Sequence, residues 1–198
     1  LLRRLGAMDA TPAAVLRDPG VRAAADALAD DEPMAADEGL ALVAALLHLV
    51  AAAGATVEDE PWLARIPLPD ATGHPVPAGE LLVPEATVLD LLDADPAELT
   101  VAAEAVQRWG PAVLRAVGVR DGFGTVRDID VPLDGQMWHD LDDEGGWVAA
   151  VLASLPRHDL PPVLVELTAV RDLDLVRDDS WPQALAVLGG SPATRPAV

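Results

Sequence analysis

The sequence predicts an α+β fold, with a helical N-terminal lobe followed by a mixed α/β region that holds a Pro-rich β-hairpin and short strands between helices. Segments with apolar residues at helical spacing alternate with short extended runs, and no repeat recurs at a fixed period. Hydrophobic residues make up 51% of the 198 residues, which is enough to build a core. We expect a helical lobe at 1–54, a mixed α+β region at 55–190 and a C-terminal linker at 191–198.

Helix-start signals define the N-terminal lobe. Thr11 and Asp18 each stand immediately before a proline, which favours a capping side chain followed by a first helical turn. Two short helices are therefore expected, ending near residues 17 and 29.

A third helix is expected from Asp37, which serves as its cap, to Gly54, a glycine suited to the position after a helix end. Its apolar run, 40–53, is shorter than the roughly 20 residues needed to cross a bilayer. The run therefore predicts a buried helix, with His48 in the core or at an interface.

A Pro-rich hairpin is expected next. Residues 62–69 form a short extended run, 70–73 a turn, and 76–83 a return strand. Prolines cannot donate hydrogen bonds to a sheet, so these strands are expected to lie at a sheet edge or to pair only through their non-proline positions.

The second half of the chain alternates between helices and strands. Asp95 and Glu98 have the spacing of a capping box, and apolar residues follow at helical spacing from Leu99 to Trp109. Gly110 breaks this helix, and a second one is expected at 111–117. The remaining expected elements are strands at 123–131, 163–170 (buried) and 172–176, an apolar helical stripe at 147–155 and a final helix at 180–189.

The charge balance excludes several partners. The chain has 33 acidic and 13 basic residues, a formal net charge of −20, so it repels nucleic acid and anionic membranes. It contains no cysteine, which excludes disulfides, thiolate nucleophiles and cysteine zinc sites and suits a cytoplasmic protein.

Catalytic patterns are scarce. The serines stand outside any nucleophile elbow, the chain has no phosphate-binding glycine loop, and Asp128 and Asp130 fit the alternation of a half-exposed strand. The sequence therefore predicts no catalytic residue, no cofactor and no metal ligand.

The densest acidic patch, 140–145, is similar to the first six residues of a calcium-binding loop. The twelfth position of such a loop is a bidentate Glu, whereas here it is Val151. A solvated loop with carboxylates at the N-terminus of the next helix explains it better. One alternative stays open, a metal-assisted hydrolase that uses His139, Asp140, Asp142 and Asp143 within the 139–144 cluster.

Five tryptophans are available as anchors for packing or for partners. Trp109, Trp147 and Trp181 fall on apolar helical faces and are expected in the core. Trp62 and Trp138 stand beside prolines or polar loops. They are candidate partner contacts, together with three residues of the hairpin, which are Pro69, Asp70 and Gly73.

The hairpin sequence, Ile-Pro-Leu-Pro-Asp-Ala-Thr-Gly at 66–73 and its continuation at 74–81, resembles that of sacsin-like proteins, relatives of the ninety-kilodalton heat-shock chaperone. The segments 11–19, 114–119 and 126–134 are similar to the region downstream of the ATP-binding domain in large actinobacterial proteins of this group.

The resemblance implies an accessory, non-enzymatic role. The family's ATP fold uses an Asn for magnesium and an Asp-x-Gly-x-Gly turn for adenine; this chain has no Asn, and Asp121-Gly122-Phe123-Gly124 does not supply the turn. The resemblance thus implies an interaction or scaffold segment whose partner is the ATP-binding domain of the same polypeptide or a client protein. A further alternative is an acidic binding module for a basic protein partner.

Overall fold

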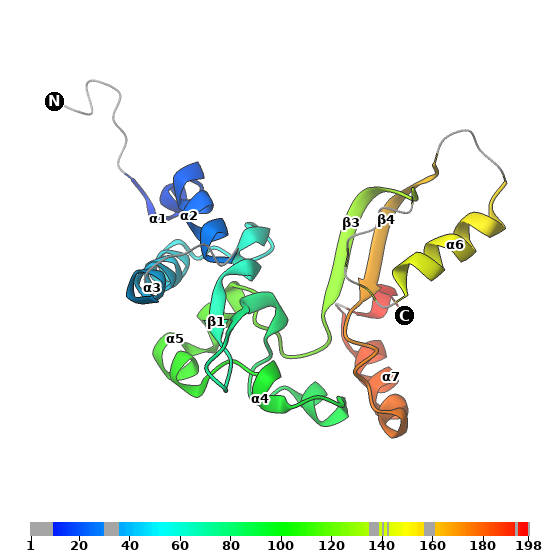
Figure 1. Cartoon of the computed structure of the whole chain (residues 1–198). Helices are drawn as coiled ribbons and strands as arrows, with labels where there is room; N and C mark the ends of the chain where they lie inside the picture. Colours follow the sequence, from blue (N-terminus) through cyan, green and yellow to red (C-terminus); the bar gives the residue numbers. More distant parts are fainter. Residues whose placement is uncertain are drawn as a thin grey trace. The chain divides into compact units, whose positions relative to one another are not determined.

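The computed structural model describes residues 10–29, 36–134, 139, 141, 143–156, 161–192 and 194–197. This part of the chain has an α+β fold with seven α-helices and two separate antiparallel sheets of two strands each (Figure 1). It divides into two compact units. Unit 1 comprises Leu1–Ala86 and Asp95–Asp121, and unit 2 comprises Thr87–Ala94 and Gly122–Val198. This division differs from the boundary expected at residue 54, because the N-terminal helices contact elements that follow them in unit 1.

The N-terminal helices of unit 1 are α1 (Pro12–Leu16), α2 (Pro19–Ala29) and α3 (Ala36–Ala53). The starts of α1 and α2 follow local signals: the Thr11 hydroxyl accepts a hydrogen bond from the Ala14 N–H at 3.2 Å, and the Asp18 carboxylate accepts one from the Gly20 N–H at 2.8 Å. The expected cap of the third helix, Asp37, was wrong, because α3 begins at Ala36 and Asp37 lies within it. The third helix ends before Gly54, whose φ of 63° suits glycine. The three helices pack together, and Leu16, Leu46 and Val50 are buried.

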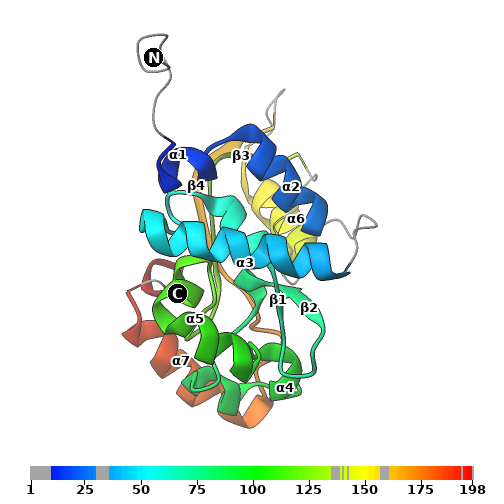
Figure 2. The same ribbon diagram turned by 90° about the vertical axis from the view of Figure 1, so that its left-hand side faces the viewer.

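His48 is exposed on α3, so of the two expected positions, in the core or at an interface, the core is wrong and the interface stays a prediction. Its ring meets the ring of Trp109 edge to face, with centroids 4.7 Å apart. Trp109 belongs to α5 (Ala103–Ala116), and Figure 2 shows α3 beside α5 within unit 1.

The expected hairpin is present in unit 1 but is shorter than predicted. It consists of β1 (Pro67–Pro69) and β2 (Pro75–Pro77), with Leu68 opposite Val76. Two 3-10 turns flank it, η2 (Pro61–Arg65) and η3 (Ala78–Glu80). The return strand ends at Pro77 because the chain turns into η3, after which Leu82 forms isolated bridges to Thr100 and Arg120.

The helix expected from Asp95 is divided into α4 (Pro96–Leu99) and α5. The Asp95 carboxylate caps α4 by accepting from the Ala97 N–H at 2.9 Å. The chain then becomes extended, because the Val101 N–H donates to the Leu82 carbonyl at 3.0 Å instead of continuing the helix. The predicted break at Gly110 is confirmed by its φ of 75°.

Unit 2 is built on a ribbon of two antiparallel strands, β3 (Thr125–Pro132) and β4 (Val163–Val170). Thr125 lies opposite Val170 at one end and Pro132 opposite Val163 at the other. The other elements of this unit are η4 (Thr87–Leu91), α6 (Glu144–Ser154), η5 (Asp178–Ser180), α7 (Trp181–Gly190) and η6 (Arg195–Ala197).

Three expectations for unit 2 were wrong. The strand 163–170 is not buried, because a two-stranded ribbon leaves Val163 and Val165 56% and 81% exposed. Residues 172–176 form a turn with one isolated bridge, from Leu92 to Val176, rather than a strand. The segment expected as a linker packs instead, since Thr194 is buried and its hydroxyl donates to the Leu188 carbonyl at 2.6 Å.

Across the described part of the chain, no helix is both long enough and apolar enough to span a bilayer.

Candidate functional site

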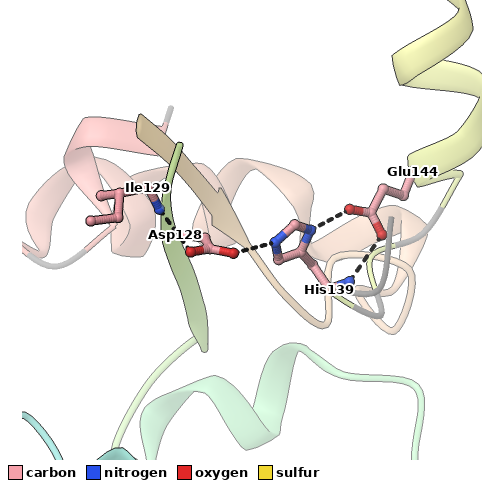
Figure 3. A network of polar contacts seen from close by, with 4 residues as sticks. All are labelled: Asp128, Ile129, His139 and Glu144. Carbon is pink, nitrogen blue, oxygen red and sulfur yellow. Dashed lines mark hydrogen bonds and ion pairs between the residues drawn. The ribbon is translucent and has the colours of Figure 1, made fainter. Parts of the chain in front are cut away.

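The most concentrated polar network of unit 2 surrounds His139, which the fold places between β3 and the start of α6 (Figure 3). Asp128 comes from β3, and Glu144 is the first residue of α6. The imidazole and the Glu144 carboxylate are nearly buried, with side chains 8% and 9% exposed, whereas the Asp128 side chain is 50% exposed.

Both ring nitrogens of His139 meet a carboxylate. Nδ1 lies 2.6 Å from Glu144 Oε1, and Nε2 lies 3.2 Å from Asp128 Oδ2. The His139 backbone N–H also donates to Glu144 Oε2 at 3.2 Å, and the Ile129 N–H donates to Asp128 Oδ1 at 2.7 Å. The carboxylates can only accept, so the geometry favours an imidazolium that donates from both nitrogens.

The network raises the pKa of His139 and lowers the pKa of Asp128, so each shift favours the charged form of its group. Burial of the imidazole lowers the pKa of His139, but the hydrogen bonds that it donates to Glu144 and Asp128 outweigh burial and leave that pKa raised. The hydrogen bond from His139 is the largest cause that lowers the pKa of Asp128. Both shifts therefore stabilise the ion pair between the His139 imidazolium and the Asp128 carboxylate.

This arrangement acts as a latch that ties the start of α6 to the ribbon. In the imidazolium form both nitrogens of His139 donate, so in that form neither has a lone pair that could abstract a proton or bind a metal. We call Asp128, His139 and Glu144 the His139 latch.

The latch differs from the site that the sequence suggested. The sequence groups His139 with its neighbours Asp140, Asp142 and Asp143, of which Asp140 and Asp142 lie outside the described residues. Asp143 is exposed, and its φ of 47° sets the turn into α6. The partners of His139 are Asp128, eleven residues earlier, and Glu144, which was expected in a solvated loop. No sequence signal marks the pair formed with Asp128, since it depends on the fold.

Asp130 does not pair with Asp128 as a second carboxylate on a regular strand. Its φ of 55° lies in the left-handed region, so the alternation of side chains along β3 is interrupted at that residue.

The hairpin turn of unit 1 is organised by Asp70, which is 3% exposed and therefore is not the surface contact that was expected. Its Oδ1 accepts from the Thr72 hydroxyl at 2.7 Å, the Thr72 N–H at 2.8 Å and the His74 N–H at 2.9 Å. The hydroxyl bond is the largest cause of its lowered pKa. Of the other hairpin candidates, Gly73 is exposed and Pro69 is half-buried.

The tryptophans also differ from expectation. Trp62 is only 5% exposed, because it is part of the core of unit 1, and its indole N–H donates to Glu60 Oε2 at 3.2 Å. It is therefore not a free contact residue. Trp147 was expected in the core and is 43% exposed, and Trp109 and Trp181 are half-buried. Trp138 lies outside the described residues.

Unit 2 also contains a cavity of about 730 Å³. Its walls come from the start of α6, from β4 and the turn that follows it, and from α7. Trp147 and Leu185 line it and are 43% and 52% exposed, so the cavity is accessible from the surface.

Among the described residues, no group of three or more His, Cys, Asp or Glu side chains is placed to hold a metal ion. Comparison with models of protein families, with curated proteins and with solved structures found no significant match to this chain.

Proposed function

We propose that this chain is a non-catalytic interaction or scaffold segment of a larger, cytoplasmic, sacsin-like chaperone-type protein, which contacts the ATP-binding domain of the same polypeptide or a client. One observation carries the proposal. Of the eight large hydrophobic residues that are exposed in the described part of the chain, seven lie in unit 2. They are Ile129, Trp147, Leu152, Leu155, Val163, Val165 and Leu185.

These side chains favour protein contact for a physical reason. Each square ångström of apolar surface removed from water contributes about 25 cal/mol, so a partner that covers them gains binding energy. Single exposed apolar residues are ordinary, but their concentration on one of two units supports an interaction role for that unit.

A metal-assisted hydrolase at 139–144 is the alternative. It has less support, because both ring nitrogens of His139 already meet carboxylates of this chain.

Calorimetry with ATP and magnesium tests the non-catalytic part of the proposal. We expect no binding heat from the isolated chain. Binding with micromolar affinity would overturn the proposal, since the chain would then hold a nucleotide site.

Binding to a permanently unfolded protein, reduced and carboxymethylated lactalbumin, tests the interaction part. We expect the chain to bind it and Val165→Asp to weaken that binding. The matched control is Leu40→Asp, which changes a residue that is 66% exposed but lies in unit 1. Equal losses in the two variants would contradict the assignment of the contact surface to unit 2.

A further inference from the structure

The cavity of unit 2 combines a shaped apolar wall with an acidic lining. Its apolar part includes Trp147 and Leu185, both partly exposed, and Leu188, which is 2% exposed. Concave sites of roughly 300–1,000 Å³ bind side chains and small ligands, and partly exposed Trp is the residue type most enriched at binding anchors.

The charges that line the cavity are mainly negative. Three of the residues that line it are acidic, Glu144, Asp172 and Asp174, and one is basic, Arg171. The charge of Glu144 is already paired with His139 in the latch, whereas Asp174 is exposed to solvent and is the carboxylate that an occupant can reach.

The whole of unit 2 has the same sign. Its sequence, 87–94 and 122–198, contains 15 acidic residues and five arginines. An occupant with positive charges beside its apolar groups is therefore attracted from a distance and then held by contact, while an acidic occupant is repelled.

We propose that this cavity is a docking site for a basic amphipathic segment of a protein, in which an apolar side chain enters between Trp147 and Leu185 and flanking Arg or Lys side chains face Asp174 and Asp172. This rests on the proposed interaction function and specifies where the contact is made and the chemistry of the partner. The aromatic ring of Trp147 also offers a face for one of the cations.

The experiment measures binding by the full chain of a synthetic amphipathic peptide of about 15 residues, with leucines on one face and arginines on the other. Two further peptides replace either the leucines by serine or the arginines by glutamate. We expect binding of the first peptide only, with weaker binding at about 1 M salt, where charges are screened.

Two pairs of variants locate the site. Leu185→Ser should weaken binding about 10-fold, whereas Leu152→Ser, which changes a residue 37% exposed outside the cavity lining, should leave it unchanged. Asp174→Asn should weaken binding roughly 3-fold, and Asp93→Asn, an exposed carboxylate of unit 2 outside the lining, should not. Thermal melting of each variant confirms that it is folded.

Several results would overturn the inference. Equal binding of the serine-substituted peptide would show attraction by charge alone, and equal binding of the glutamate-substituted peptide would exclude a basic partner. Binding unaffected by Leu185→Ser would place the contact elsewhere. Binding of the small aromatic amine tryptamine, with the peptide inert, would assign the cavity to a small ligand. None of these results depends on whether the chain binds ATP. Failure of the docking-site inference can therefore be distinguished from failure of the proposed function.

Discussion

The two units of this chain differ in how they use their apolar side chains. Among the described residues, nine of the twelve largest fully buried side chains belong to unit 1, whereas seven of the eight exposed large hydrophobic residues belong to unit 2. The stability of unit 1 therefore depends on its apolar core. In unit 2 the His139 latch adds a polar link between β3 and α6, and more apolar surface stays exposed to water. The difference predicts that core substitutions are most costly in unit 1, and it supports the proposed contact role of unit 2.

The core of unit 1 gives the largest expected effect. Leu63 is fully buried, so Leu63→Ala should lower the free energy of unfolding by about 3 kcal/mol through lost burial and a residual cavity. Leu40→Ala, at a position 66% exposed, serves as the control and should change it by less than about 0.5 kcal/mol. Urea denaturation measures both. Similar losses would contradict the picture of a unit stabilised by its core.

Close backbone packing in unit 1 gives the next effect. Gly118 has a φ of 101°, and a Cβ there would lie 3.2 Å from Ala64 Cβ and 3.5 Å from Gly79 Cα. Gly118→Ala should therefore cost about 1–3 kcal/mol, from backbone strain and crowding. The control is Gly122→Ala, where a Cβ would meet no atom within 4 Å and where φ is not positive. Thermal melting compares them, and a neutral Gly118→Ala would show that this region is loosely packed.

The His139 latch gives an intermediate effect that depends on pH. His139→Gln should destabilise unit 2 by about 2 kcal/mol at pH 6, because the nearly buried Glu144 carboxylate loses its charged partner. Because the pKa of His139 is raised, this stabilisation is complete below pH 6.5, and it is lost as the pH rises through the raised pKa. Because the pKa of Asp128 is lowered, its contribution to the free energy of unfolding is complete above pH 3.8, and this contribution is lost as the pH falls through the lowered pKa.

Denaturation of the wild type and of His139→Gln across this range tests the latch. The difference between the two proteins should be largest near pH 5–6 and shrink in alkali. His74→Gln, at an exposed histidine of unit 1, is the control and should lack this profile. A constant difference at every pH would show that the imidazole acts only by packing.

The exposed ribbon gives the smallest effect on stability. Val165→Thr keeps a β-branched side chain at a position 81% exposed and should change the free energy of unfolding by less than about 0.5 kcal/mol. It should nevertheless raise solubility, since it removes apolar surface from a two-stranded ribbon. Light scattering at increasing protein concentration measures this. A marked loss of stability would show that Val165 is buried in solution.

Signals that act over a few residues were predictable from the sequence. The caps at Thr11, Asp18 and Asp95 and the breaks at Gly54 and Gly110 are where they were expected, because each depends on a side chain or a backbone angle within one turn of the chain. The α+β class followed from the same local patterns.

Features that need distant partners were not predictable. Val101 leaves the expected helix because a hydrogen bond to Leu82 competes with the helical one. The latch pairs His139 with Asp128 on another element, and an apolar strand, 163–170, stays partly in water because only one other strand pairs with it. Composition and spacing determined the class of fold, the net charge and most helix ends. The tertiary structure decided which apolar residues are buried and which carboxylates contact His139. Both depend on contacts between segments that are far apart in the chain.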